Sequence, residues 1–185
     1  METTAQPILS TRKIVVTAVL AAISILLGVT QLGLIPVPNL SGHATIMHVP
    51  VIIGSVLEGS VVGSLIGGIF GIFSFIDATS PVFKNPIVAI VPRVLIGITA
   101  YYAYAMLKSL NEYGALVASA VVGSLTNTVF VLGLAGLFGL IPWTAMPAII
   151  PQAIAEMIIA AIITVAVVGA WKRIESGAGG GAKKV

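Results

Sequence analysis

The feature that most constrains this chain is a charge inside an apolar stretch of membrane length. Residues 87–104 read IVAIVPRVLIGITAYYAY, and Arg93 is the one charged side chain among them. Charged side chains inside membrane spans are rare, and they face protein or water instead of lipid. Pro92 lacks a backbone N–H and disfavours helix at the residue before it, which predicts locally irregular backbone beside the charge. The first question about this sequence is therefore what Arg93 faces.

The rest of the chain is equally apolar. Hydrophobic residues occupy 58% of the 185 positions and charged residues 8%, too little polar surface to cover a soluble globule. We therefore expect an integral membrane protein. Because there is no cysteine, disulfides and thiolate metal sites are excluded. The first apolar run, after Arg12 and Lys13, is about 21 residues long, which is too long for a signal-peptide core and predicts a retained span.

Breaks in hydrophobicity predict an all-α membrane domain with six spans over residues 1–173. Residues 45–76 as one helix would be roughly 48 Å long against a hydrocarbon core of ~30 Å, so we predict a hairpin that turns at Glu58-Gly59-Ser60. Its limbs are short, which predicts that neighbouring helices partly shield them. Residues 174–185 are expected to form a flexible basic tail. The predicted spans are residues 14–34, 45–57, 61–76, 87–107, 115–139 and 148–171.

The distribution of basic residues predicts that both termini are cytoplasmic. With six spans, the cytoplasmic side holds Arg12, Lys13, Lys108, Lys172, Arg173, Lys183 and Lys184, and the outer side holds Lys84. A single helix over 45–76 would change the split to three against five, which violates the positive-inside rule. The outward segments are then residues 35–44, 77–86 and 140–147.

Small residues on two spans indicate close helix packing. Gly63, Gly67 and Gly71 recur every fourth residue, which places them on one helix face where a neighbouring backbone can approach. We expect this face to pack inside the bundle. Ala18 and Ala22 form a similar smooth stripe in the first span. That stripe is compatible with internal packing and also with a docking face for another membrane protein.

Three strings in order, together with the Ala18-x-x-x-Ala22 motif, resemble the substrate-binding S components of energy-coupling factor (ECF) vitamin transporters. They are HVPVIIGSVLEGSVVGSLIGGIFGIFSF at 48–75, PRVLIG at 92–97 and GSLTNTV at 123–129, and they look like the pantothenate-type and related subunits. The resemblance covers residues 12–173. It implies a binding subunit without catalysis or cofactor, in a prokaryotic cell membrane, that captures a small water-soluble vitamin from outside.

The same resemblance implies protein partners. The Ala18/Ala22 face would dock to a membrane scaffold subunit, and two cytoplasmic ATPases would drive transport. The sequence agrees independently, because it contains no G-x-x-x-x-G-K-[ST] motif with which to hold nucleotide phosphates. Nothing in it suggests a nucleic-acid partner.

Arg93 and Glu156 are the first candidate site residues. Counted from the outer ends of their spans, Arg93 lies roughly 10 Å deep and Glu156 ~13 Å deep at 1.5 Å per residue. One interpretation is a structural ion pair between them. The other is that Arg93 binds a carboxylate of the ligand, for which the planar guanidinium fork is suited. Both hold if Glu156 orients the arginine and leaves donors free.

Further candidates come from polar side chains at similar depth. Asn127 must find hydrogen-bond partners near the middle of its span, and Gln152 lies one helical turn before Glu156. His48 is a possible ligand partner near the outer side, and no metal site is expected because no carboxylate or cysteine accompanies the histidines. Pantothenate is the predicted vitamin, and pyridoxine is the alternative if Glu156 neutralises Arg93. A stand-alone channel or transporter is the alternative from another functional class.

Overall fold

The computed structural model describes residues 9–36, 43–78 and 80–181. This part of the chain forms six α-helices, so the predicted all-α architecture is confirmed. It also contains a short two-stranded sheet and two 3₁₀ turns, which the sequence analysis did not predict. The elements are α1 (Thr11–Val29), β1 (Leu34–Pro36), β2 (His43–Thr45), α2 (Val49–Glu58), α3 (Ser60–Ile76), η1 (Pro81–Lys84), α4 (Pro86–Leu107), α5 (Glu112–Leu137), η2 (Trp143–Ile149) and α6 (Ile150–Gly181).

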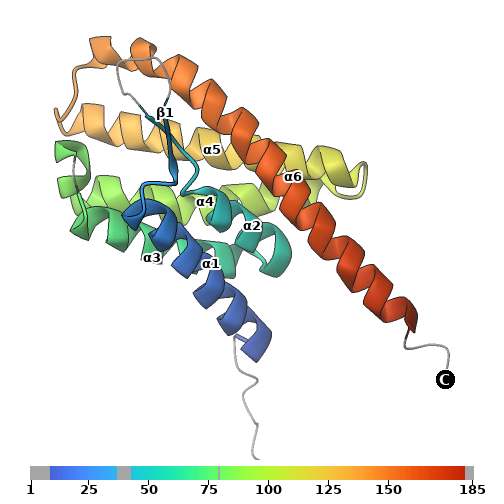
Figure 1. Ribbon diagram of the computed structural model, residues 1–185. Helices are drawn as coiled ribbons and strands as arrows, with labels where there is room; N and C mark the ends of the chain where they lie inside the picture. The colour runs from blue at the N-terminus through green and yellow to red at the C-terminus, as the bar shows by residue number, and fades with distance from the viewer. Residues whose placement is uncertain (1–8, 37–42, 79, 182–185) are drawn as a thin grey trace, which may run out of the picture.

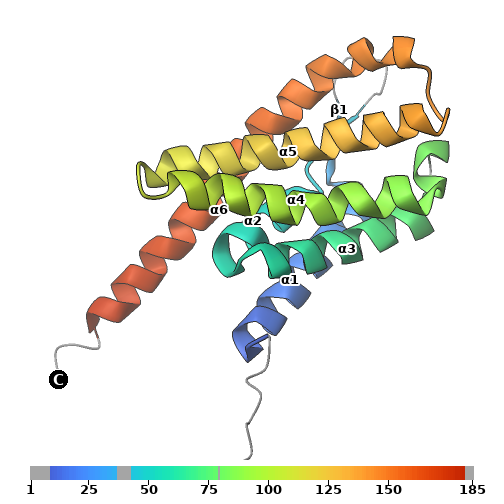
Figure 2. The same cartoon turned by 180° about the vertical axis from the view of Figure 1, so that it is seen from behind.

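The helices form a bundle with two directions of packing. Figures 1 and 2 show α3, α4 and α5 lying side by side, with α1 and α6 crossing them obliquely and α2 between these two groups. The closest neighbours are α3 with α4 and α4 with α5. α4 is therefore the middle helix of the layer, which explains why a charged side chain on it can be enclosed by protein.

Four helices are long and apolar enough to cross a membrane, and α2 and α3 are shorter. The predicted turn between them is confirmed, because α2 ends at Glu58 and Gly59 adopts a φ of 100° that favours glycine. α2 has only 10 residues, all buried from Val49 to Val56. The predicted shielding of this limb by neighbours is therefore correct.

The second predicted span begins later than expected. The span was expected to begin at Thr45, but Thr45 is the last residue of strand β2, which pairs antiparallel with β1 in the register Leu34 with Thr45 and Pro36 with His43. The helix starts only at Val49, with Pro50 in its first turn. Proline is tolerated there because its missing N–H would have no partner within the helix anyway.

The glycines of α3 pack against α4, as predicted. A Cβ atom added to Gly67 would lie 2.0 Å from the carbonyl oxygen of Arg93, and one added to Gly71 would lie 2.8 Å from the Cα of Ile90. In return, a Cβ on Gly97 of α4 would lie 2.2 Å from the backbone nitrogen of Ser64. The two backbones are in direct contact along this stripe, which fixes the position of Arg93.

Charged residues join several elements at one end of the bundle, which we call the Arg12 end. Arg12 Nε lies 2.6 Å from Glu58 Oε1, and Arg12 Nη2 lies 2.7 Å from Glu175 Oε1. Glu58, at the predicted turn, has a side chain only 7% exposed and is paired within the chain. Lys172 and Glu112 form a third ion pair at this end. The segments predicted to be cytoplasmic therefore gather at one end, while the orientation of that end in the cell stays a prediction.

The last helix is longer than predicted. α6 continues to Gly181, ten residues past the expected end of the span at Trp171, so the predicted flexible tail over 174–185 is helical through residue 181. Residues 182–185 lie outside the described residues. The ion pair from Glu175 to Arg12 shows that the start of this segment is held against α1.

Candidate ligand-binding site

A polar cavity of about 350 Å³ lies at the end of the bundle opposite the Arg12 end. This volume is at the lower limit of the ~300–1,000 Å³ typical of small-molecule sites. Its walls come from the last turns of α1 and α3, the strands β1 and β2, the turn η1, the first half of α4, the middle of α5 and the first turn of α6. Three predicted site residues line it, namely Arg93, Asn127 and Gln152, together with Gly28, Gln31, Leu34, Thr45, Met47, Phe70, Phe73, Ser74, Asp77, Ala78 and Phe83.

The arginine is anchored to its own helix. The predicted irregularity at Pro92 is wrong, because α4 is helical throughout with the proline inside it. Pro92 has no N–H to offer the carbonyl of Val88, four residues earlier. Arg93 Nη1 donates to that carbonyl oxygen at 2.9 Å instead. A helical side chain points back toward the N-terminus of its helix, which brings the guanidinium to the freed acceptor.

Two aromatic rings cover the guanidinium. The Cζ atom of Arg93 lies 4.5 Å from the ring centroid of Phe83, in η1, and 5.5 Å from that of Phe70, in α3. Both distances are within the range of cation–π attraction. The Nε of Arg93 is buried and has no hydrogen-bond partner among the described residues. The arginine is thus enclosed, at 4% exposure, with donor capacity still unused.

No salt bridge joins Arg93 to Glu156 in the described part of the chain, although the two charges are near enough to attract each other. Glu156 Oε1 accepts instead from the backbone N–H of Thr45 at 2.8 Å and from Gln152 Nε2 at 2.9 Å. The carboxylate therefore holds strand β2 and Gln152 in place, and both residues that it contacts line the cavity. The direct ion pair between Arg93 and Glu156, one of the two interpretations of Arg93, is therefore not formed.

Asn127 presents an unused acceptor beside the cavity. Its side chain is 8% exposed, and its Oδ1 has no hydrogen-bond partner among the residues described. A buried carbonyl oxygen without a donor costs roughly 1–3 kcal/mol. The cavity thus combines a cation that has donors to spare with an acceptor that lacks a donor.

His48 lies behind the cavity, not in its wall. The ring is fully buried at the start of α2, and its Nε2 is 2.8 Å from Ser124 Oγ. Its Nδ1 has no partner in the described residues. The structure therefore brings Arg93, Asn127 and Gln152 to the cavity and keeps His48 and Glu156 one layer away.

Comparison with known proteins identifies the family. A model of the ECF transporter substrate-specific component matches residues 12–168. This chain belongs to that family. It is also similar to the Pantothenic acid transporter PanT of Lactococcus lactis subsp. cremoris (strain MG1363), with 34% identity over 152 residues that cover 68% of this chain and 76% of that protein.

Membership of this family sets the general function. The chain is a substrate-specific component (S component) of an ECF transporter, a multi-pass protein of the prokaryotic membrane. It is a substrate-binding subunit and not an enzyme, so it works with the other subunits of an ECF module. In the part of the chain that the structure describes, the cavity lined by Arg93 offers polar groups to a small ligand.

Sequence reasoning missed several residues of the cavity wall. Phe83 and Asp77 lie in the predicted outward segment 77–86 and were not singled out, although both line the cavity. Gln31 was also missed, and its φ of 57° is unusual for a residue other than glycine. Gln31 follows the last turn of α1, where glycine commonly ends a helix in this conformation. The available signal was a residue other than glycine at this position, because a side chain held in a strained backbone conformation indicates a functional role.

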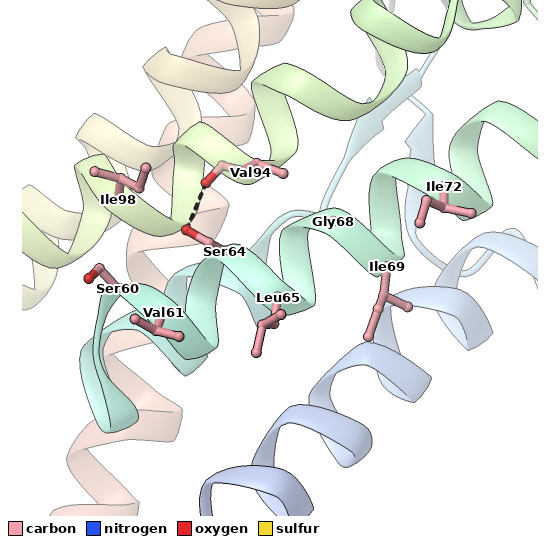
Figure 3. A pocket seen from close by; sticks show the side chains of 9 residues that line it. All are labelled: Ser60, Val61, Ser64, Leu65, Gly68, Ile69, Ile72, Val94 and Ile98. Carbon is pink, nitrogen blue, oxygen red and sulfur yellow. Dashed lines mark hydrogen bonds between the residues drawn. The ribbon is translucent and has the colours of Figure 1, made fainter. Parts of the chain in front are cut away.

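A larger groove of about 590 Å³ on the outside of α3 and α4 does not have the properties of a vitamin site. Figure 3 shows it lined by aliphatic side chains such as Leu65, Ile69 and Ile72. Ser64, its inner polar residue, already donates from its Oγ to the carbonyl oxygen of Val94 at 3.2 Å. The groove offers little with which to recognise a polar ligand, and its lining suits lipid chains.

The alanine stripe of α1 faces outward. Ala18 and Ala22 are exposed, whereas Ala21 and Ser24, on the other side of the helix, are buried. Internal packing therefore uses the Ala21 side of α1. The Ala18 side of this S component is left open along its length.

Proposed function

We propose that this S component captures pantothenate and delivers it through an ATP-driven ECF complex. The observation that carries the proposal is the pairing of unused groups in the cavity. Arg93 offers donors to an anion, and Asn127 Oδ1 requires a donor. Pantothenate has one carboxylate, two hydroxyls and an amide N–H, so it can satisfy both. The similarity to a protein named as a pantothenic acid transporter supports the same choice.

The carboxylate would bind at the free edge of the guanidinium. Nη1 is engaged by Val88, which leaves the edge that carries Nε. Two parallel N–H···O bonds from such an edge are a strong and directional arrangement for a carboxylate. Because the described residues place no carboxylate within salt-bridge distance of Arg93, the positive charge remains to be balanced by the ligand. This favours an anionic vitamin over neutral pyridoxine.

The other site residues would divide into two groups. Asn127 and Gln152 line the cavity and would accept from or donate to the hydroxyls and amide of the ligand. Glu156 and His48 would act from behind. Glu156 fixes Gln152 and β2 through its hydrogen bonds, and His48 supports α5 through Ser124.

Delivery of the vitamin requires the remaining subunits. We propose that the exposed Ala18/Ala22 stripe of α1 docks to the membrane scaffold subunit, because small residues let another helix approach closely. Two ATPases bound to the scaffold would supply the energy. Substitution of Ala18 by Leu should then reduce co-purification of the scaffold subunit without reducing vitamin binding.

Binding of radiolabelled pantothenate to the purified S component tests the substrate. We expect saturable binding that excess unlabelled pantothenate displaces and excess pyridoxine does not. Arg93→Lys keeps the charge but loses the bidentate edge, so it should weaken pantothenate binding by at least about tenfold, which is ~1.4 kcal/mol. Arg93→Ala should abolish it. Tight binding of pyridoxine with no binding of pantothenate would refute the assignment.

A further inference from the structure

Phe83 is the residue of the cavity wall whose role the proposed function leaves unexplained. It is apolar and half-buried, and it does not belong to one of the six helices. Nevertheless its ring is the closer of the two that cover the Arg93 guanidinium, at 4.5 Å from Cζ. A ring at this distance from a charge that must bind a ligand has more than a packing role.

The position of Phe83 is fixed by the caps on both sides of it. Ser80 begins the turn η1, with its Oγ accepting from the N–H of Val82 and its carbonyl accepting from the N–H of Phe83 at 3.1 Å. Asn85 then caps α4, with its Oδ1 accepting from the N–H of Ile87 at 3.0 Å. The turn is thus joined rigidly to the helix that carries Arg93. The ring of Phe83 and the guanidinium are held in one unit.

The cavity has three phenylalanines, and only two of them touch the charge. Phe70 and Phe83 lie within cation–π distance of Arg93. Phe73 lines the same cavity but has no such contact in the described structure, and it packs instead toward α1 near Gly28. Phe73 is therefore a matched control for the effect of removing an aromatic ring from the wall.

We propose that Phe83 determines specificity for the charged form of the ligand by positioning Arg93. Its ring attracts the guanidinium and keeps water from one face of it. The arginine then loses little freedom when a carboxylate binds, and the carboxylate meets a partly desolvated charge. This inference rests on the proposed function, because it assumes that the ligand carboxylate meets Arg93.

The proposal differs from a simple contact role in what it predicts for an uncharged analogue. Pantothenol carries an alcohol in place of the carboxylate of pantothenate and is otherwise the same molecule. If Phe83 acts through Arg93, its loss should weaken pantothenate and leave pantothenol almost unchanged. If Phe83 merely packed against the ligand, both molecules would lose affinity by the same factor.

Isothermal titration of the purified full chain with pantothenate and with pantothenol tests this. For the unsubstituted protein we expect pantothenate to bind more tightly. In Phe83→Leu, the Kd of pantothenate should rise by about tenfold relative to the Kd of pantothenol, an effect between those of an exposed and a fully desolvated cation–π contact. Phe83→Tyr should keep the Kd ratio of the unsubstituted protein, because it retains the ring. Phe73→Leu should leave it unchanged.

The outcomes separate the two proposals. Equal affinity for both ligands in the unsubstituted protein would refute recognition of the carboxylate, and with it the proposed function. A preference for pantothenate that is as large in Phe83→Leu as in the unsubstituted protein would refute the role of Phe83 alone. A parallel loss for both ligands in Phe83→Leu would also refute it, in favour of direct contact. Thermal unfolding of each variant shows whether a loss of binding reflects loss of the fold.

Discussion

Substitution of Gly67 by alanine should displace Arg93 without changing any polar group. The added Cβ would lie 2.0 Å from the carbonyl oxygen of Arg93 and 2.7 Å from its carbonyl carbon. A carbon and an oxygen in contact are normally ~3.3 Å apart, so the two backbones must separate by more than about 1 Å. The atoms in conflict are backbone atoms, which cannot rotate away as a side chain can.

The expected cost can be estimated from known cases. Overpacking of a helix contact typically costs ~1–3 kcal/mol, and alanine recovers about 1 kcal/mol through its better helix propensity. We expect a net loss of up to about 2 kcal/mol, or an apparent melting temperature lower by up to roughly 4–8 °C for a chain of this size. Pantothenate affinity should fall as well, because the shifted α4 carries the guanidinium with it.

The adjacent glycine provides the control. A Cβ on Gly68 would find only Val94 Cγ2, at 3.8 Å, which is an ordinary contact. Gly68→Ala should therefore keep the affinity and raise stability by up to about 1 kcal/mol, the gain in helix propensity. Thermal unfolding in detergent and titration with pantothenate measure the two quantities for each variant. If Gly67→Ala and Gly68→Ala behaved alike in both, the close approach of α3 and α4 would not be what positions Arg93.

Three further substitutions test the cavity wall and the carboxylate that supports it from behind. Glu156→Ala should lower stability by about 1–3 kcal/mol, because the Thr45 N–H loses its acceptor. Glu156→Gln should retain most of the stability of the unsubstituted protein. Equal unfolding temperatures for the two variants would contradict this role of Glu156. Gln31→Gly should raise the unfolding temperature slightly, because it removes a left-handed conformation that costs a side chain about 1 kcal/mol, and a clear loss of stability would argue against strain at this position.

The parts of the fold that follow local rules were predictable from the sequence. The turn at Gly59 followed from length, since residues 45–76 are too long for one span. The packing face of Gly63, Gly67 and Gly71 followed from their spacing, because only small residues allow two backbones to touch. Arg93 was found by its charge, since a cation in an apolar run is conspicuous.

The parts that depend on contacts distant in sequence were not predictable. Strand β2 depends on pairing with β1 and on the carboxylate of Glu156, 111 residues beyond Thr45. Phe83 is an ordinary apolar residue in a loop, and only the fold shows that it faces Arg93. The irregular backbone expected at Pro92 was wrong because the arginine's own side chain replaces the missing donor, which backbone rules alone do not consider.

The complete burial of α2 has a consequence for how this protein responds to its membrane. A change in bilayer thickness stresses helices through the mismatch between their apolar length and the lipid, and it acts where helix meets lipid. The four long helices are exposed to that stress. α2, enclosed from Val49 to Val56, is not. This part of α2, just after His48 behind the cavity, is therefore shielded from direct contact with lipid, and hydrophobic mismatch reaches the site only through the helices around it.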